Sequence, residues 1–370
     1  MSDRVTIARV AEEAGVSAMT VSNVLNGKPG ASDETRRRVL EVAERLGYQA
    51  NISARNLKAG RSGLIGVLTL DLTTQYGLEI VRGIADELAA AERELLINAT
   101  YQDAAREMER IEFLSRGLVD GVLMVAPVLE PDTVDLLRRK NVPCVVIDPR
   151  RQDVALPRVI VDNYQGMRAG TEHLLALGHT RIGYIRGEDD MDSSTIRFQG
   201  FCDALSLAGL EVDPNLVVDC DFTYAHGFQA ASVMIAEHRP TAIVAGADLI
   251  AFGAVDAARA LGLNVPEEFS VVGFDDLPQA GQSFPGLTTV RQPLHDMGQT
   301  AARALLSLLD GQRLLMDRMQ LPTDLVVRGT TAPPGDVDGG LARLLAGGAT
   351  DGAGKAGKAG NAAGGADRDA

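Results

Sequence analysis

From residue 64 onwards the sequence alternates between short apolar runs and amphipathic helical stretches, and this alternation constrains the fold more than any other feature. The apolar runs are LIGVLTL (64–70), ELLINA (94–99), GVLMVA (121–126), PCVVID (143–148), RIGYIRG (181–187), TAIVAG (241–246) and SVVGFDD (270–276). The helical stretches are residues 78–91, 104–116, 163–177, 196–209, 226–237 and 249–261. Strand and helix in regular succession predict parallel sheets covered by helices on both faces. Ligands of such sheets bind beyond the carboxyl ends of the strands.

The first 50 residues follow a different pattern, which predicts a set of short packed helices. Thr6 can cap a helix from Ile7 to Ala14, Ser17 one from Ala18 to Leu25, and Ser32 a third. Gly15 ends the first helix, so the turn before the second is short and contains glycine. A DNA-binding helix-turn-helix has this arrangement.

The distribution of charge supports a nucleic-acid partner for the N-terminal part alone. The whole chain has a formal net charge of -14. Residues 1–62 contain 10 Lys and Arg against 7 Asp and Glu, a net charge of +3, whereas the remainder contains 26 against 43, a net charge of -17. A small basic head on an acidic body is typical of a protein whose head alone touches phosphates.

A length of 370 residues exceeds one compact core and predicts several folding units. We expect a helix-turn-helix domain over residues 1–50, a hinge helix or linker over 51–62, and a ligand-sensing and dimerisation body of two α/β subdomains over 63–332. Glycine and alanine dominate residues 333–370, a composition that predicts a disordered tail.

Several classes of protein lack support in the sequence. The cysteines, Cys144, Cys202 and Cys220, form no CxxC pair, which favours buried free thiols in a reducing cytoplasm. The N-terminus does not resemble a secretory signal, and no apolar run is long enough to span a membrane. Dinucleotide, Walker A, HExxH and GxSxG motifs are absent, so we expect neither catalytic residues, nor a metal, nor a cofactor.

Two groups of residues carry a resemblance to a known family. VTIARVAEEAGVSAMTVSNVLNG (5–27), followed by TRRRVLEVAERLGYQAN (35–51), resembles the head of the LacI/GalR family of bacterial transcriptional regulators. The later runs match in order: GYIRGEDDMDSSTIRFQGF (183–201), PTAIVAGADLIAFGAV (240–255), SVVGFDDLP (270–278) and PGLTTVRQPLHDMG (285–298). The resemblance implies an all-α helix-turn-helix head and a periplasmic-binding-protein-like body of two Rossmann-like α/β subdomains. It also implies three crossings between the subdomains, near residues 160–163, 288–293 and 320–324.

The resemblance implies a DNA-reading surface on the second helix. Positions matching Ala18, Met19 and Asn23 choose bases, because asparagine can pair with adenine and a small apolar side chain can meet a thymine methyl. Positions matching Ser17, Thr20 and Ser22 hold phosphates. We also assign Thr6 and Asn26 to this surface. In the linker, Ala54 would let two hinge helices pack closely, and Leu57 would wedge into the minor groove and kink the duplex. One head makes few contacts, so we expect a homodimer on a near-palindromic operator.

The resemblance also implies an effector site between the subdomains. Carboxylates at strand ends, an arginine and an aromatic ring together suit a polar ligand, most simply a carbohydrate. For Asp248 and Asp276, which lie beside helix starts, we favour a structural cap or ion pair instead. The expected effector-binding residues are Asp71, Tyr76, Asp148, Arg197, Phe222, Ala247, Asp275 and Gln292.

Three alternatives stay open beside a cytoplasmic repressor controlled by a sugar. An enzyme could also carry aspartates at strand ends, although no nucleophile and base accompany them here. A periplasmic binding protein would share the fold of the body but not the head. Within regulation, the body could sense a partner protein or a phosphorylated metabolite, which basic residues at the mouth of the site would support. The acidic loop GEDDMD (187–192) speaks against such a metabolite.

Overall fold

The computed structural model describes residues 5–25, 28–48 and 62–348. These residues form two compact units, which we call the head (residues 5–48) and the body (residues 64–116 and 121–348). Residues 51–61 of the expected hinge helix or linker, among them Ala54 and Leu57, lie outside the described residues, as does Asn26.

The head consists of three helices, α1 (Ile7–Ala14), α2 (Ala18–Leu25) and α3 (Asp33–Arg45). Their starts agree with the predicted caps: the side chains of Thr6, Ser17 and Ser32 accept hydrogen bonds from main-chain N–H groups of the first turn of α1, α2 and α3. The C-cap Gly15 adopts a left-handed conformation with φ of 63°, which a glycine reaches without steric cost. Buried apolar side chains of all three helices form one small core, which includes Val10, Val21 and Val39.

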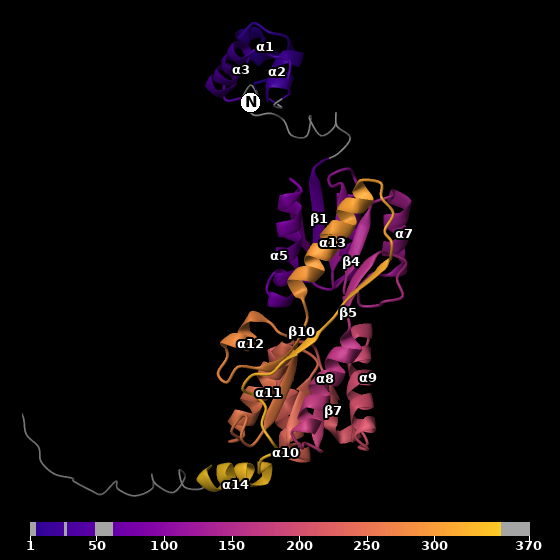
Figure 1. Ribbon diagram of the computed structural model, residues 1–370, viewed down its shortest axis with the longest axis vertical. Coiled ribbons are helices and arrows are strands. Elements are labelled where there is room, and N and C mark those ends of the chain that lie inside the picture. The colour runs from indigo at the N-terminus through magenta and orange to yellow at the C-terminus, as the bar shows by residue number, and fades with distance from the viewer. Residues whose placement is uncertain (1–4, 26–27, 49–61, 349–370) are drawn as a thin grey trace, which may run out of the picture. The chain divides into compact units, whose positions relative to one another are not determined.

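The body contains two six-stranded sheets (Figure 1). The first has the order β11-β5-β4-β3-β1-β2 and is parallel throughout. The second has the order β12-β10-β9-β8-β6-β7 and is parallel except for β12, which is antiparallel to β10. The strands of the first sheet are β1 (Leu64–Thr69), β2 (Glu94–Ala99), β3 (Gly121–Val125), β4 (Cys144–Ile147), β5 (Arg158–Val161) and β11 (Arg318–Leu321). Those of the second are β6 (Ile182–Arg186), β7 (Val217–Asp219), β8 (Ala242–Ala245), β9 (Ser270–Asp275), β10 (Thr288–Arg291) and β12 (Asp324–Val326).

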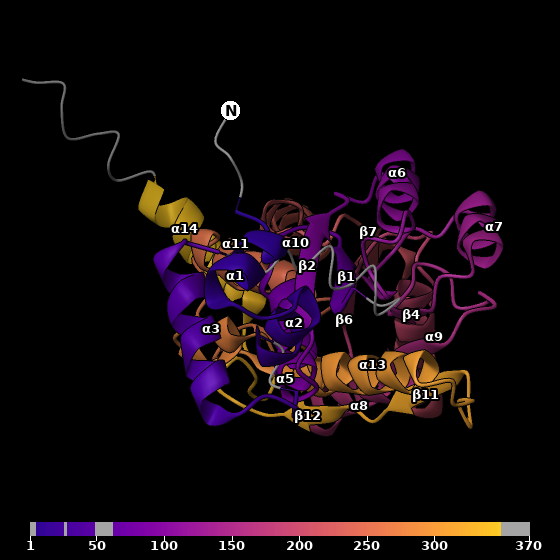
Figure 2. The same ribbon diagram turned by 90° about the horizontal axis from the view of Figure 1, so that it is seen from above.

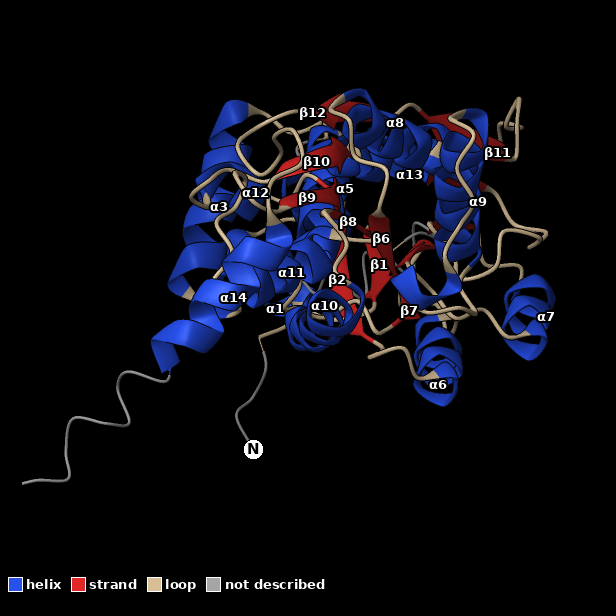
Figure 3. Ribbon diagram, turned by 90° about the horizontal axis from the view of Figure 1, so that it is seen from below, coloured by secondary structure: helices blue, strands red, loops and turns tan. Residues whose placement is uncertain are grey.

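Helices cover both faces of each sheet, as the alternation predicted (Figure 3). The first sheet carries α5 (Gln75–Ala90), α6 (Ala104–Leu114), α7 (Pro131–Lys140) and α13 (Leu294–Leu309). The second carries α8 (Asn163–Ala176), α9 (Asp192–Leu207), α10 (Tyr224–His238), α11 (Asp248–Ala260) and the short α12 (Pro278–Gln282), with a 3₁₀ turn at Pro214–Leu216. Every residue of the inner strands β3, β4, β8 and β9 is buried, because both faces of a parallel sheet are covered, whereas the edge strands β2, β7, β11 and β12 are partly exposed.

Helices α5 and α13 lie side by side although far apart in the sequence (Figure 2). A Cβ atom on Gly83 would lie 2.0 Å from the main-chain oxygen of His295, and one on Gly298 would lie 2.1 Å from that of Ile80. The two glycines therefore permit the close approach of the helices. Helix α13 comes after most strands of the second sheet in the chain, but it packs on the first sheet. The first subdomain is therefore completed by a segment that is distant in sequence.

The three crossings between the subdomains are confirmed where the resemblance implied them. The chain leaves the first sheet after β5 and enters α8, returns after β10 into α13, and crosses again between β11 and β12. The expected fold class, an all-α head followed by a body of two α/β subdomains, is also confirmed.

The predicted disordered tail is wrong for its first part. Residues Val337–Gly348 form helix α14. Val337 is buried and Leu341 packs against the core of the second subdomain, while Arg343 makes an ion pair with Glu268. Two apolar residues one helical turn apart thus meet an apolar surface, which the average composition of residues 333–370 concealed.

Candidate functional site

A cavity of about 390 Å³ lies between the two subdomains of the body, at the carboxyl ends of the strands. Its walls come from loops of both sheets, so its shape depends on how the subdomains close. The lining residues are Leu70, Asp71, Thr74, Tyr76, Tyr101, Gln102, Ala126, Asp148, Glu188, Met191, Ser193, Arg197, Asp221, Phe222, Thr223, Ala247, Leu249, Asp275 and Leu277.

Three lining residues at strand ends have strained main-chain conformations. Ala126 and Asp148 follow β3 and β4 with φ of 48° and 46°, and Asp275 ends β9 with φ of 124°. Positive φ is uncommon for residues with a Cβ atom, and it persists only where the surroundings fix it. These conformations therefore mark the strand ends as places where the fold maintains a particular side-chain direction.

Arg197 of α9 is the central cation of the cavity and is 3% exposed. Its Nε donates to Oδ1 of Asn163 at 2.7 Å, its Nη1 donates to the main-chain oxygen of Gly246 at 2.7 Å, and the guanidinium lies 3.8 Å from the ring centre of Phe274. Nη1 also lies 3.9 Å from Oδ1 of Asp275. Packing and hydrogen bonds thus fix the guanidinium beside a buried carboxylate.

Tyr76, which is half-buried, and Asp148, which is buried, form a hydrogen-bonded pair on the wall from the first subdomain. The Tyr76 hydroxyl donates to Oδ2 of Asp148 at 2.7 Å, whereas Oδ1 of Asp148 is buried and has no hydrogen-bond partner in the described structure. Burial raises the pKa of Asp148, against the opposing effects of Arg197 and of the hydrogen bond from Tyr76. Burial and the adjacent Asp148 carboxylate raise the pKa of Tyr76 well above its usual value, so the phenol stays a donor. An unpaired buried oxygen of this kind is suited to accept a hydrogen bond from a ligand.

Asp275 is the matching carboxylate of the second subdomain. Burial raises its pKa to about 6, opposed by the charge of Arg197 and by the hydrogen bond from Gln292. That bond runs from Nε2 of Gln292 to Oδ1 of Asp275 at 2.6 Å. Gln292 is not among the residues that line the cavity; it lies behind Asp275 and orients it.

The aromatic ring of Phe222 lies over Gly187 on the second-subdomain side. A Cβ atom at Gly187 would lie 1.8 Å from Cζ of the ring, so a larger residue there would displace the ring. Asp71 has a different environment, because its Oδ1 accepts from the main-chain N–H groups of Thr73 and Thr74 in a tight turn. Asp71 and Phe222, both expected to bind the effector, thus line the cavity, but Oδ1 of Asp71 is already engaged in its own turn.

Of the eight residues expected to bind an effector, all except Gln292 line the cavity. The sequence reasoning missed other lining residues, among them Tyr101, Gln102 and Glu188. For Glu188 a signal existed, because it belongs to the acidic loop at 187–192. For Tyr101 and Gln102, which follow β2, only the rule that ligands bind at strand ends could have suggested a role.

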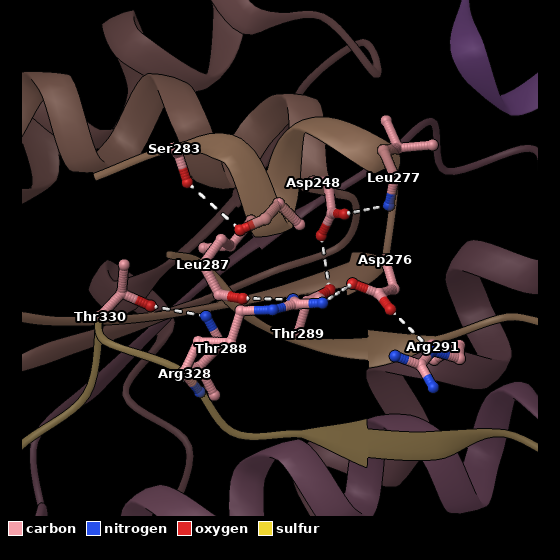
Figure 4. A network of polar contacts seen from close by, with 11 residues as sticks. Asp248, Asp276, Leu277, Ser283, Leu287, Thr288, Thr289, Arg291, Arg328 and Thr330 are labelled. Carbon is pink, nitrogen blue, oxygen red and sulfur yellow. Dashed lines mark hydrogen bonds and ion pairs between the residues drawn. The ribbon is translucent and has the colours of Figure 1, made fainter. Parts of the chain in front are cut away.

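The structural roles favoured for Asp248 and Asp276 agree with the structure (Figure 4). Asp248 is fully buried and accepts from the main-chain N–H of Leu277 at 2.8 Å and from the hydroxyl of Thr289 at 2.5 Å. Asp276 accepts from Arg291 at 2.7 Å and from Arg328 at 2.6 Å. Both carboxylates fix the segment that follows β9 and so hold Asp275 in place.

The predicted DNA-reading residues within the described chain lie at the start of the head and along α2. Met19 is 60% exposed, Ala18 is exposed, and Ser22 and Asn23 are half-buried. The hydroxyls of Ser17 and Thr20 lie 2.9 Å apart, and Ser17 accepts from the main-chain N–H of Thr20. Thr6 accepts from the N–H of Arg9 as the cap of α1. The exposed apolar side chains and the half-buried amide of this short helix can reach base edges in a major groove.

The described residues offer neither a metal-binding cluster nor a membrane-spanning helix. No group of three or more His, Cys, Asp or Glu side chains there could hold a metal ion. No helix among them is both long and apolar enough to cross a membrane.

Comparison with known proteins yields similarity over nearly the whole chain. Residues 6–51 match the sequence profile of "Bacterial regulatory proteins, lacI family", and residues 171–331 match that of a "Periplasmic binding protein-like domain". The HTH-type transcriptional regulator DegA of Bacillus subtilis is 31% identical over 333 residues, which cover 89% of this chain and 99% of DegA.

Two solved structures are similar to this chain in fold as well as in sequence. The Lac repressor dimer bound to operator and the anti-inducer ONPF matches with a TM-score of 0.81 and 31% identity, covering 89% of this chain and 100% of the other. The complex of the transcriptional regulator CelR with cellobiose matches with a TM-score of 0.68 and 31% identity, covering 88% and 100%. The similarity therefore includes both the head and the body.

Proposed function

The chain belongs to the LacI family of bacterial regulatory proteins, and from this premise we propose that an uncharged, polyhydroxylated effector in the cavity of the body controls its affinity for operator DNA. It is a DNA-binding transcriptional regulator of the repressor type with a sugar-binding effector domain. Its relatives are regulators of transcription, and on that ground we propose no catalytic role for the aspartates at the strand ends.

The observation that carries the proposal is the convergence of Asp148, Arg197 and Asp275 on one cavity from two subdomains. The unpaired Oδ1 of Asp148 offers an acceptor to a hydroxyl group. The ring of Phe222 offers an apolar face against which a sugar ring can stack. Because Arg197 and Asp275 belong to one subdomain and Asp148 and Tyr76 to the other, a ligand that touches both sets stabilises one relative arrangement of the subdomains.

The charge of the cavity argues for an uncharged ligand. Arg197 is the only basic residue among the lining residues, and its guanidinium is already paired. The acidic lining residues are Asp71, Asp148, Glu188, Asp221 and Asp275. A phosphorylated sugar would meet like charges at several points, which disfavours the phosphorylated metabolite considered above.

On DNA, we propose that the protein binds as a homodimer to a near-palindromic operator, as the Lac repressor dimer does on its own operator. Met19 and Asn23 would select bases, with Ala18 beside them, and Ser17, Thr20, Ser22, Thr6 and Asn26 would contact the backbone or support the helix. Ala54 would let the two hinge helices pack closely, and Leu57 would wedge into the minor groove. A dimer doubles the number of base contacts, which one small head cannot supply alone.

A thermal-shift screen of the full chain tests the effector class. D-Ribose, D-glucose and cellobiose would be compared with ribose 5-phosphate and glucose 6-phosphate at equal concentrations. We expect a neutral sugar to raise the melting temperature with concentration, since a ligand of the folded state stabilises it by mass action. Phe222→Ala should abolish the shift, while Phe113→Ala, at an exposed ring of α6, should retain it. Stabilisation by the phosphorylated sugars alone would contradict the proposal.

A selection from random DNA tests the assignment on α2. Asn23→Ala should change the preferred base at one symmetric pair of positions, because the loss of a bidentate contact relaxes discrimination by ~1–3 kcal/mol. An unchanged motif would remove Asn23 from the reading surface.

A further inference from the structure

Two loops of the body, one from each subdomain, meet across the effector cavity. Residues 148–152 follow β4 of the first subdomain, and residues 187–192 lead from β6 to α9 in the second. The main-chain N–H of Asp192 donates to the carbonyl oxygen of Arg150 at 2.9 Å. In the opposite direction, the main-chain N–H of Gln152 donates to Oδ2 of Asp192 at 2.6 Å. These two bonds join the subdomains directly.

The side chain of Arg150 adds a charged connection at the same place. Its Nη2 donates to Oε2 of Glu188 at 2.8 Å, and its Nη1 donates to Oδ1 of Asp190. Nη2 also lies 3.4 Å from Oε1 of Gln102, a residue of its own subdomain. One guanidinium thus pairs with two carboxylates of the opposite subdomain.

The pairing of Arg150 with Glu188 differs from an ordinary surface ion pair. The side chains of Arg150 and Glu188 are 16% and 22% exposed. The neighbouring Arg151 contacts Asp153 at 3.8 Å, with exposures of 63% and 78%. Exposed pairs of the second kind contribute little, whereas shielded, charge-assisted hydrogen bonds with short distances contribute more. The chain therefore offers two adjacent arginines, of which only one bridges the subdomains through a protected contact.

The charged connection is also part of the cavity wall. Glu188, Gln102 and Met191 line the cavity, and Arg150 contacts the first two from behind. Within the described structure, Oε1 of Glu188 accepts no hydrogen bond, while Oε2 is held by Arg150. The carboxylate of Glu188 is therefore positioned on the wall by a residue of the other subdomain.

We propose that Arg150 is a positioning residue of the effector site, which clasps the two subdomains through Glu188 and Asp190 and holds the cleft closed around the cavity. The proposal rests on the function proposed above in taking the cavity as the effector site. While the clasp is formed, Glu188 presents an acceptor to a ligand hydroxyl, and Nη1 and Nη2 of Arg150 are engaged by Asp190, Glu188 and Gln102. Any change that breaks the clasp opens the cavity and removes one of its walls.

Hydrogen exchange of the full chain without added ligand tests the clasp. The amide protons of Gln152 and Asp192 report closure, because each is donated to an oxygen of the opposite subdomain. Arg150→Met should accelerate their exchange about tenfold or more, given the usual strength of hydrogen bonds to charged groups. Arg151→Met removes the same charge one residue away and should leave both rates unchanged. Amides within β4 and β6 should stay protected in both variants, which verifies that the fold is intact.

Two further variants separate the clasp from a general weakening of the loop. The pair Glu188→Gln and Asp190→Asn removes the charges from the other subdomain with little change of shape and should accelerate the same two amides. Arg150→Glu combined with Glu188→Arg restores an ion pair across the cleft and should recover at least part of the protection. Equal exchange rates in wild type, Arg150→Met and the Gln/Asn pair would overturn the proposal. The exchange experiment contains no sugar, so its result does not depend on the sugar screen. Failure of the sugar screen would contradict the proposed effector class but not the clasp.

Discussion

Replacing Arg197 by alanine should destabilise the body strongly. Arg197 is almost completely buried and donates two hydrogen bonds of 2.7 Å, to Asn163 and to the carbonyl oxygen of Gly246. The substitution leaves these two acceptors without their donor and the Asp275 carboxylate without its nearest cation, and it empties the space above the ring of Phe274. The change therefore affects the fold as well as ligand binding.

The expected magnitude follows from these contacts. A hydrogen bond from a charged donor contributes ~1.5–3 kcal/mol, and a desolvated cation above an aromatic ring contributes up to about 2 kcal/mol. These contributions are not additive, and breaking a buried ion pair by removing one partner costs ~3–5 kcal/mol. We expect Arg197→Ala to lose an amount in this range, with the pKa of Asp275 rising further because its closest cation is gone.

Denaturant unfolding followed by circular dichroism measures the loss. Arg291→Ala is the matched control, because Arg291 is half-exposed and its partner Asp276 retains Arg328. Its loss should stay below about 1 kcal/mol. The double variant Arg197→Ala with Asp275→Asn should recover part of the stability, since it removes the unpaired carboxylate. A loss of less than about 1 kcal/mol in Arg197→Ala would refute the view that this arginine holds the site together.

Arg197→Lys keeps the positive charge and is therefore the milder variant in which to measure sugar binding by titration.

Three more predictions concern pH, the aromatic face and the C-terminal helix. The pKa of Asp275 in the folded protein, about 6, lies above its ordinary value of 3.8. Protonated Asp275 therefore stabilises the fold below pH 4, and this contribution to the free energy of unfolding, at most about 3 kcal/mol, is lost as the pH rises through 6. Asp275→Asn should flatten the pH dependence in unfolding measurements across that range. Gly187→Ala should displace the ring of Phe222 and weaken sugar binding about as much as Phe222→Ala does, and unchanged sugar titrations would contradict the stacking role. Val337→Asp should lower the melting temperature by burying a charge under α14, whereas Val327→Asp, at a position 56% exposed, should change it little.

The head was predictable because its signals are local. Thr6, Gly15, Ser17 and Ser32 act within one turn of their own position, so reading them in order gave the helix boundaries. The strand-end aspartates were predictable for a related reason, since the carboxyl ends of parallel strands meet at one edge of a sheet.

Contacts between distant segments were not predictable in the same way. Gln292 was expected in the site, but β10 places it behind Asp275, and only the spatial order of the strands shows this. The pairing of Arg150 with Glu188 joins residues 38 positions apart, and neither residue belongs to a pattern that points to the other. Helix α14 was missed because its order comes from the surface on which Val337 packs, not from its own composition.

The three crossings have a consequence for the order in which the protein can fold during synthesis. The strands β1–β5 are made first, but their sheet lacks α13 on one face and β11 at one edge until about 160 further residues have followed. At typical rates of translation this interval lasts on the order of ten seconds. During it, the apolar face that α13 covers, with Val145, Ile147 and Leu123 on it, has no partner on the growing chain. When β10 emerges, the second subdomain lacks only β12, the segment that follows β12, and α14. The half of the body that is begun first is therefore finished nearly last, and its apolar face stays uncovered by its own chain meanwhile.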